Sequence, residues 1–358
     1  MLDRERFPRV KLCGGWLTPA VWDTLELAPE QYPRSLWNWA RCHVEHAGSF
    51  HTVSGSGYFI RRYEFDDFLL ARSGAEVIQH AVRSFEKRDG LWLVDAAYAA
   101  PILIAAGGTH CLLARRAFQQ PRGTLVAAQE HEFRAGSEAV TAARVGLDGE
   151  PELLLHDDWG GYSWNVPKGD WLNVGSGTSE PREVRAAWAA AREFFLSAGH
   201  LPKSAVTALA DARGHSYYLF DPRHLAACEL DGILIAGDAL GLAHPLTGEG
   251  ILPAVLSGRL AAEAILSGTS YRRALEQHVV IRDYMLAHAL LALGIALRRR
   301  LGSGAARSRG SRVPVRWTEA AIARGFAGLF SGRPLLGSNL LGAALLRLHR
   351  HKEAKLRP

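Results

Sequence analysis

The sequence predicts a mixed α/β fold in which an antiparallel sheet lies beside an α/β unit and a helical C-terminal region follows. Three patterns carry this prediction. Residues 232–236 are apolar and lead through a loop rich in Gly and Pro into an apolar run from Ile251, which is the order strand, loop and helix. Two alternating segments flank Pro167-Lys-Gly-Asp170, which is typical of an antiparallel hairpin. From Tyr271 the apolar residues recur at helical spacing.

The segments between these patterns fit the same class. Residues 37–60 alternate enough to predict short strands, and a helix is expected over 65–72 because acidic residues stand near its start. Strands are expected at 76–82 and 91–94, with a turn at 87–90 between them.

Three further elements follow in chain order. A buried strand is expected after Pro101, and it ends at the pair Gly107-Gly108. A helix is expected over 183–198, and a flexible linker over 302–311, which is rich in Gly and Ser.

These patterns divide the chain into three parts. The chain has 358 residues, of which 48% are hydrophobic, so it can hold two ordinary domains. We expect an α/β domain from 1–36, 60–120 and 212–270, an antiparallel sheet domain from 37–59 and 121–211, and a helical region over 271–358.

Charge and cysteine usage restrict the partners. The net charge is +6, the pI is near 9.3, and much of the excess lies after residue 297. Zinc-finger spacing and basic repeats interleaved with aromatic residues are absent from the sequence, so nucleic acid is not an expected partner. The four Cys are far apart and the N-terminus is charged, so we expect free thiols in a cytoplasmic protein.

The C-terminal segment predicts a contact with an anionic membrane surface. It is basic and carries leucines near helical spacing. The longest apolar stretch, 285–297, is too short to span a bilayer. The leucines are Leu335, Leu336, Leu340, Leu341, Leu345 and Leu346.

The loop after residue 236 carries the most informative chemistry. Asp238 stands where the apolar strand ends, a position suited to a carboxylate that accepts hydroxyl donors from a polyol chain. Gly248 and Gly250 remove side chains, so backbone N–H groups can approach a planar ligand. The helix that follows directs its positive end at that ligand.

Four segments, in order, resemble the geranylgeranyl reductase family of FAD-dependent oxidoreductases, a group within the flavoprotein hydroxylase-like fold class. They are Arg9-Val-Lys11-Leu-Cys13-Gly14-Gly15, Arg62-Tyr-Glu-Phe65-Asp66-Asp-Phe-Leu69, the stretch Gly161 to Gly177, and Gly237-Asp238 through Gly258. The resemblance implies a Rossmann-like FAD-binding domain and a substrate-binding antiparallel sheet.

Residue by residue, the resemblance implies an FAD site. Asp238, next to Gly237, would hold the ribityl chain, and Asp3 would hold the adenosine ribose. The remaining contacts with FAD would come from Arg9, Lys11, Arg62, Gly108, Pro245, Gly248 and Gly250. The fold class usually has Asp-Gly where this chain has Gly107-Gly108, which removes one polar contact. The basic side chains have an alternative interpretation as solvated surface.

The resemblance also assigns residues to the substrate. Cys13 would lie near the flavin ring, where it either donates a proton or only packs. Tyr162 and Trp164 share one strand face with Val166 and would form an aromatic wall for a long apolar substrate. That face has an alternative interpretation as ordinary core. Pro167 would also contact the substrate.

One family element is missing from the sequence. The family begins with a strand, a G-x-G-x-x-G turn and a helix that bind the FAD pyrophosphate. This chain opens at Met1-Leu2-Asp3, which resembles the end of the second strand of that unit. We therefore expect about 30 residues upstream. Either the natural start lies further upstream, which we favour, or the protein is truncated and holds FAD weakly or not at all.

The predicted activity is reduction of a carbon–carbon double bond in a prenyl or similar lipid, with NAD(P)H or a ferredoxin-like carrier as electron donor. The alternatives are a flavin-dependent monooxygenase or halogenase, although the W-x-W-x-I signature of halogenases is absent, and a non-catalytic lipid-binding remnant. Strand alternation separates His43 from His46, so no metal site is expected. Hydrolase chemistry is not expected either, because the sequence lacks a G-x-S-x-G motif.

Overall fold

The structure, a computed structural model, has the mixed α/β architecture that the sequence predicts. It describes residues 1–117, 123–136, 149–157, 160–202, 204–302, 325 and 328–332. The Leu-rich tail and nearly all of the predicted linker lie outside the described residues.

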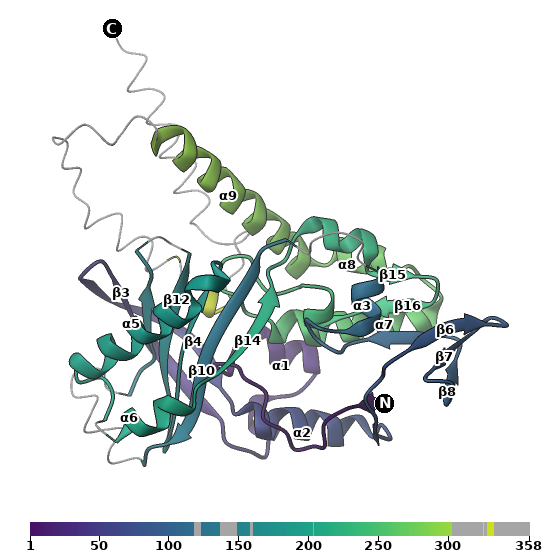
Figure 1. The fold of residues 1–358 in the computed structure, drawn as a ribbon, viewed down its shortest axis with the longest axis horizontal. Helices are drawn as coiled ribbons and strands as arrows, with labels where there is room; N and C mark the ends of the chain where they lie inside the picture. Colours follow the sequence, from purple (N-terminus) through teal and green to yellow (C-terminus); the bar gives the residue numbers. More distant parts are fainter. Residues whose placement is uncertain are drawn as a thin grey trace, which may run out of the picture.

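A large curled sheet of eight strands dominates the fold (Figure 1). Its neighbours are antiparallel except β11 and β3, which run parallel. In spatial order the strands are β14 (Arg213–Tyr218), β10 (Leu125–Arg134), β13 (Trp171–Thr178), β12 (Gly161–Lys168), β11 (Glu152–Leu155), β3 (Trp37–His46), β4 (Ser49–Phe59) and β2 (Trp16–Leu17).

The predicted hairpin forms, with a tighter turn than expected. Strands β12 and β13 pair from Gly161 opposite Thr178 to Lys168 opposite Trp171. Gly169 and Asp170 alone make the turn, and Gly169 has a φ of +59° that favours glycine. Pro167 and Lys168 were assigned to the turn, but the strand continues through both of them.

Residues 37–59 also differ from the prediction of short strands. They form one long hairpin, in which β3 and β4 pair along almost their whole length. The large sheet takes β2 and β14 from segments outside the ranges predicted for it, and the division of the chain into domains stays a prediction.

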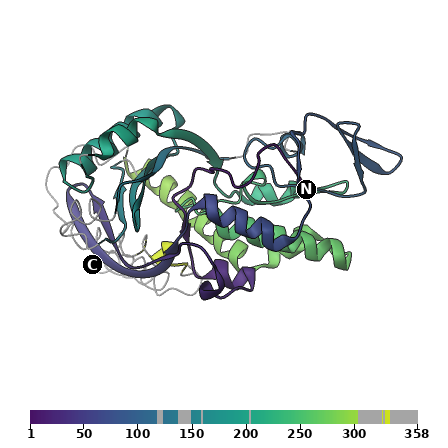
Figure 2. The same ribbon diagram turned by 90° about the horizontal axis from the view of Figure 1, so that it is seen from below.

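The remaining strands form three smaller sheets (Figure 2). β1 (Leu2–Asp3) and β5 (Ile78–Gln79) are parallel. The strand before Asp238, β16 (Ile233–Ile235), lies between β15 (Glu229–Leu230) and β9 (Leu103–Ala105). The third sheet is β6 (Phe85–Arg88), β7 (Leu91–Val94) and β8 (Tyr98–Ala100).

The structure has the predicted strand at 91–94, but the strand that precedes the turn is β6 and not the predicted strand at 76–82, of which only β5 forms. The sequence interpretation separated a strand at 76–82 from a strand at 91–94 by a turn at 87–90. In the structure β7 pairs with β6, and the turn is Asp89-Gly90, with positive φ at both residues. The polar run Glu86-Lys-Arg hid β6, because on an exposed strand both faces are solvated.

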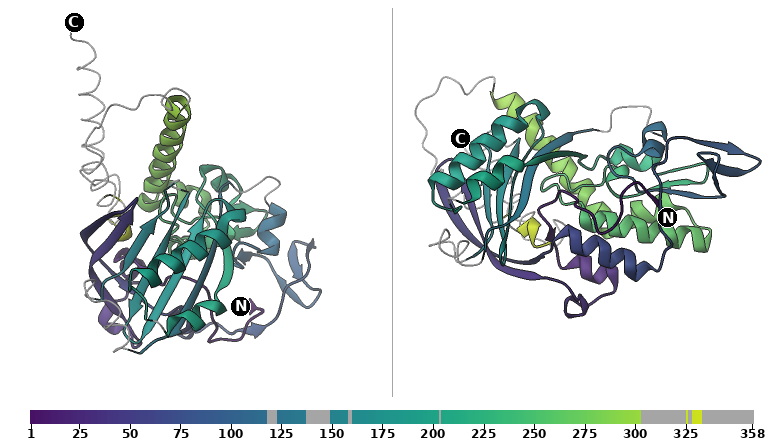
Figure 3. Two further views of the ribbon diagram at one scale, coloured as in Figure 1. Left: turned by 60° about the vertical axis from the view of Figure 1, so that its left-hand side comes forward. Right: turned by 60° about the horizontal axis from the view of Figure 1, so that its bottom comes forward.

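Helices cover both ends of the molecule. α5 packs on the outer face of the large sheet through Trp188, Ala191 and Phe195 (Figure 2). α9 extends away from the body of the molecule (Figure 3). In the part of the chain that the structure describes, no helix has the length and apolar character needed to cross a membrane. The helices are α1 (Ala20–Leu25), α2 (Arg62–Ser73), α3 (Leu112–Ala117), α5 (Val184–Ser197), α6 (Ala205–Ala208), α7 (Ile251–Ser267), α8 (Tyr271–Gln277) and α9 (Val279–Gly302).

Helix α7 supports a prediction about stability. Leu256 and Leu266 lie on this helix and are 3% and 88% exposed. Leu256→Ala leaves a cavity in the core, so we expect the free energy of unfolding to fall by roughly 2–5 kcal/mol. Leu266→Ala is the matched control and should change it by less than about 0.5 kcal/mol. Urea denaturation followed by circular dichroism measures both, and equal losses would contradict the burial of this helix face.

Candidate functional site

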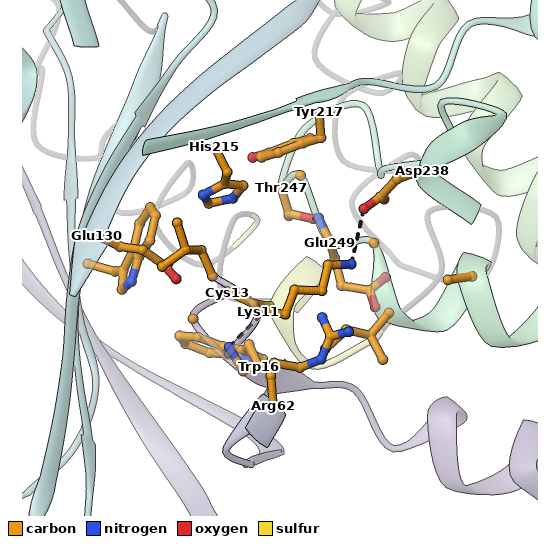
Figure 4. Close-up of a pocket in the computed structure, with 18 of the residues that line it drawn as sticks. Lys11, Cys13, Trp16, Arg62, Glu130, His215, Tyr217, Asp238, Thr247 and Glu249 are labelled. Atoms are coloured by element: carbon orange, nitrogen blue, oxygen red, sulfur yellow. Dashed lines mark hydrogen bonds and ion pairs between the residues drawn. The ribbon is translucent and has the colours of Figure 1, made fainter. Parts of the chain in front are cut away.

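A cavity of about 360 Å³ lies between the concave face of the large sheet and the first turn of α7 (Figure 4). Its volume is within the range of small-molecule sites. Residues 11–16 and the start of α2 close its remaining sides.

One wall of the cavity is the predicted aromatic face of β12. Tyr162, Trp164 and Val166 all line the cavity, as strand alternation requires. The Trp164 ring lies across Gly175 of the neighbouring strand, where an added Cβ would come within 2.1 Å of the ring. The Tyr162 hydroxyl donates to the carbonyl oxygen of Thr247 at 2.6 Å, which ties the sheet to the loop before α7.

The segment 11–16 is held against this wall by Asn173. The indole N–H of Trp164 donates to Asn173 Oδ1 at 2.7 Å, and Asn173 Nδ2 donates to the Cys13 carbonyl at 3.2 Å. The Cys13 thiol is half-buried and accepts the Gly15 N–H at 3.3 Å. Cys13 therefore lies at the cavity in a defined conformation.

Buried charged side chains lie next to residues 11–16. Lys168 is fully buried, and its Nζ donates to Glu132 at 2.7 Å. Glu132 also accepts a hydrogen bond from Arg61 at 2.9 Å. Burial raises the pKa of Glu132, but Lys168 and Arg61 outweigh it and hold that pKa below its ordinary value. Residue 15 must be glycine here, because its φ is +68° and a Cβ would lie 2.7 Å from Lys168 Nζ.

The opposite side of the cavity carries paired charges. Lys11 Nζ lies 3.4 Å from Asp238 Oδ2, and Asp238 follows β16 as predicted. Arg62 holds Asp66 in a bidentate pair at 2.5 and 2.7 Å. Burial tends to lower the pKa of Arg62, but Asp66 and Cys13 raise it above its ordinary value, so the guanidinium stays charged.

The loop before α7 presents backbone to the cavity. Gly248 has a φ of +69°, and a Cβ there would lie 2.3 Å from the Tyr217 hydroxyl. Gly250 is the N-cap of α7 and has no side-chain cap of its own. Instead, Glu249 accepts the Leu252 N–H at 2.7 Å. The chain therefore places its own carboxyl group at the helix N-terminus, where the sequence predicted that a ligand charge would be favoured.

The structure brings together eight of the predicted site residues. Those that line the cavity are Lys11, Cys13, Arg62, Tyr162, Trp164, Asp238, Gly248 and Gly250.

Six others lie elsewhere among the described residues. Arg9 is next to the cavity, because it pairs with Asp66 at 3.5 Å. Asp3 lies on β1, Gly108 follows β9, Gly237 begins the turn that carries Asp238, and Pro245 is buried in the loop before α7. Pro167 follows Val166 on β12, so its ring lies on the opposite face of the strand, and it is not among the residues that line the cavity.

Glu130, His215, Tyr217 and Glu249 are among the residues that line the cavity and that sequence reasoning missed. The available signal was alternation, since Glu130 shares a strand face with Glu132, and His215 with Tyr217. The sequence did not reveal that β10 and β14 would join the same sheet as β12, on the far side of β13.

Burial sets the ionisation of three of these groups. It raises the pKa of Glu130 to about 8 and that of Glu249 to about 7, and it lowers the pKa of His215 to about 4. Near pH 7 Glu130 and His215 are therefore mainly neutral.

Comparisons with known proteins agree with this geometry. No family model matches the sequence. An uncharacterized protein of Methanosarcina barkeri is 27% identical over 311 residues, which cover 80% of this chain and 75% of that protein. A digeranylgeranylglycerophospholipid reductase of Methanothermobacter thermautotrophicus is 28% identical over 62% of this chain. The match spans 58% of that reductase.

Two solved structures share the fold. A geranylgeranyl bacteriochlorophyll reductase-like protein from Thermoplasma acidophilum has a TM-score of 0.53 at 17% identity, covering 84% of this chain and 77% of its own. A probable FAD-dependent monooxygenase from Pseudomonas aeruginosa has a TM-score of 0.56 at 15% identity, covering 84% and 88%. The chain is thus similar in sequence to digeranylgeranylglycerophospholipid reductases and shares its fold with these two solved structures.

Proposed function

We propose that this protein is a flavin-dependent oxidoreductase that binds FAD at the cavity and reduces a carbon–carbon double bond of an isoprenoid lipid. The observation that carries the proposal is the composition of this one cavity. A carboxylate at a strand end, a loop glycine and an apolar aromatic wall all meet there, contributed by Asp238, Gly248 and Trp164. The names of the related reductases supply the substrate class.

The residues present suit a flavin. Gly248 and Gly250 line the cavity without side chains, which lets backbone approach a planar ring closely. Asp238 pairs with Lys11 through one carboxylate oxygen and has further lone pairs for ribityl hydroxyls. Lys11 and Arg62 add positive charge for an anionic reduced flavin or a phosphate. Bound FAD would supply the hydride.

The other residues that the resemblance assigns to FAD remain part of this proposal. Arg9 is positioned through Asp66, which lines the cavity. Asp3 is assigned to the adenosine ribose, Pro245 to the flavin ring, and Gly108 and Gly237 to further contacts with FAD. The electron donor, NAD(P)H or a ferredoxin-like carrier, and a cytoplasmic location with attachment to a membrane surface belong to the same proposal.

The remaining walls exclude water and hold the substrate. Tyr162, Trp164 and Val166 provide the apolar surface, and the hydrogen bond from Tyr162 to Thr247 fixes the distance between the sheet and the loop. Cys13 lies at the cavity with its thiol half-buried, where it can donate a proton to a substrate carbon.

A flavin monooxygenase is the second candidate, because the monooxygenase structure matches this fold at least as well as the reductase-like structure does. Oxygen dependence separates the two. FAD reduced with dithionite and geranylgeraniol are incubated with the protein without oxygen. A reductase yields a product two hydrogen atoms heavier, whereas a monooxygenase yields a hydroxylated product only in air. Hydroxylation in air with no anaerobic product would overturn the reductase proposal.

Asp238 supplies the first site prediction. If its carboxylate accepts ribityl hydroxyls, Asp238→Ala should weaken FAD binding roughly 10- to 150-fold, because a hydrogen bond to a charged group contributes roughly 1.5–3 kcal/mol. Quenching of flavin fluorescence on titration measures the Kd. Asp23→Ala, an exposed acid on α1, is the control and should bind as the wild type does. An unchanged Kd for Asp238→Ala would remove Asp238 from the flavin site.

Cys13 supplies the second site prediction. If its thiol donates a proton during the reaction, Cys13→Ala should lower turnover roughly 10²–10⁴-fold while the Kd for FAD stays within about twofold, since general acids contribute on that scale. Single-turnover oxidation of the reduced flavin measures the rate. Cys111→Ala, a buried thiol outside the cavity, is the matched control. Equal rates in the two variants would mean that Cys13 only packs.

A further inference from the structure

A buried carboxyl group without a full set of partners faces the cavity. Glu130, on β10, is 1% exposed and lines the cavity, and its Oε2 has no hydrogen-bond partner among the described residues. Buried polar atoms in folded proteins are nearly always paired, and leaving one unpaired is costly. This oxygen therefore indicates a ligand atom that the cavity is built to receive.

The surroundings of Glu130 include apolar side chains of the sheet. Glu130 lies opposite Gly175 in the register of β10 and β13, and the Trp164 ring fills the space above Gly175. Leu153 and Val166 also line the cavity. His215, on the neighbouring strand β14, also faces the cavity and has a buried Nδ1 without a partner among the described residues (Figure 4).

Burial and the neighbouring charges determine whether the Glu130 carboxyl group is protonated and can donate a hydrogen bond. Burial is the largest effect and raises its pKa to about 8; Glu132 acts in the same direction. Lys168, Arg62 and the Cys13 N–H lower the pKa without cancelling burial. Three further titratable side chains that line the cavity, Tyr162, Tyr217 and His215, have pKa values shifted by burial toward their neutral forms. Near pH 7 the Glu130 carboxyl is mainly protonated, so it can donate a hydrogen bond.

We propose that Glu130 recognises an oxygen atom of the substrate by donating a hydrogen bond to it, so that the lipid taken by this cavity carries an ether, hydroxyl or carbonyl oxygen within its otherwise apolar chain. The proposal rests on the proposed function only in placing the substrate in this cavity. A pure hydrocarbon would leave Oε2 unpaired and should be bound more weakly.

The test compares small isoprenoids of one carbon skeleton. Geranyl methyl ether, the hydrocarbon without the oxygen and geranylamine are titrated into the protein at about pH 7, and intrinsic fluorescence is followed because Trp16 and Trp164 line the cavity. We expect the ether to bind roughly tenfold more tightly than the hydrocarbon, the scale of one satisfied hydrogen bond. Tighter binding of the cationic amine than of the ether would show an ionised Glu130 and overturn the proposal.

Two variants separate hydrogen bonding from packing. Glu130→Leu should lose the preference for the ether, whereas Glu130→Gln should keep it, because a neutral amide still donates. In the wild type the preference should decline as the pH rises through about 8, since the carboxylate only accepts, and in Glu130→Gln it should not decline. An unchanged preference in Glu130→Leu would contradict the assignment.

FAD titrations of the same proteins distinguish this proposal from the proposed function. We expect the Kd for FAD to be the same in the wild type and in Glu130→Gln and Glu130→Leu. A large loss of FAD affinity in both variants would place Glu130 against the cofactor and overturn substrate recognition. If the wild type holds no FAD but keeps the ether preference, the proposed function fails and the recognition site stands.

Discussion

The side-chain amide of Asn173 is the contact on which the candidate site depends. It accepts the indole N–H of Trp164 and donates to the Cys13 carbonyl, so one buried side chain joins the large sheet to residues 11–16. The Trp164 ring can adopt this position only because residue 175 is glycine. The cavity therefore exists because a loop from the start of the chain is fixed at a set distance from a strand more than a hundred residues away.

Buried charge reinforces this arrangement and gives the cavity two chemically different sides. Lys168, Glu132 and Arg61 pair below residues 11–16, where each charge has a partner. Asp238 and Lys11 form an ion pair at the side nearest α7. The sheet side instead favours neutral groups, since burial opposes ionisation there. A ligand that is polar at one end and apolar at the other fits such a cavity.

The sequence predicted the parts of the site that local signals determine. Asp238 at a strand end, the glycines before α7 and the shared face of Tyr162 and Trp164 follow from motifs within a few residues, and the structure has each of them. Glu130 was not foreseen, because its position at the cavity depends on the pairing of β10 with β13. Long-range pairing of this kind leaves no local signal. The hairpin turn was predicted to begin at Pro167, but Pro167 and Lys168 belong to β12.

Hydrogen exchange with and without FAD tests the central claim most directly, because it locates the bound cofactor along the backbone. We expect addition of FAD to slow amide exchange in residues 11–16 and 247–255, which line the cavity, and around Asp238, while β6 and β7 exchange as before. FAD-dependent protection confined to segments outside the cavity would contradict the account, as would unchanged exchange throughout at saturating FAD.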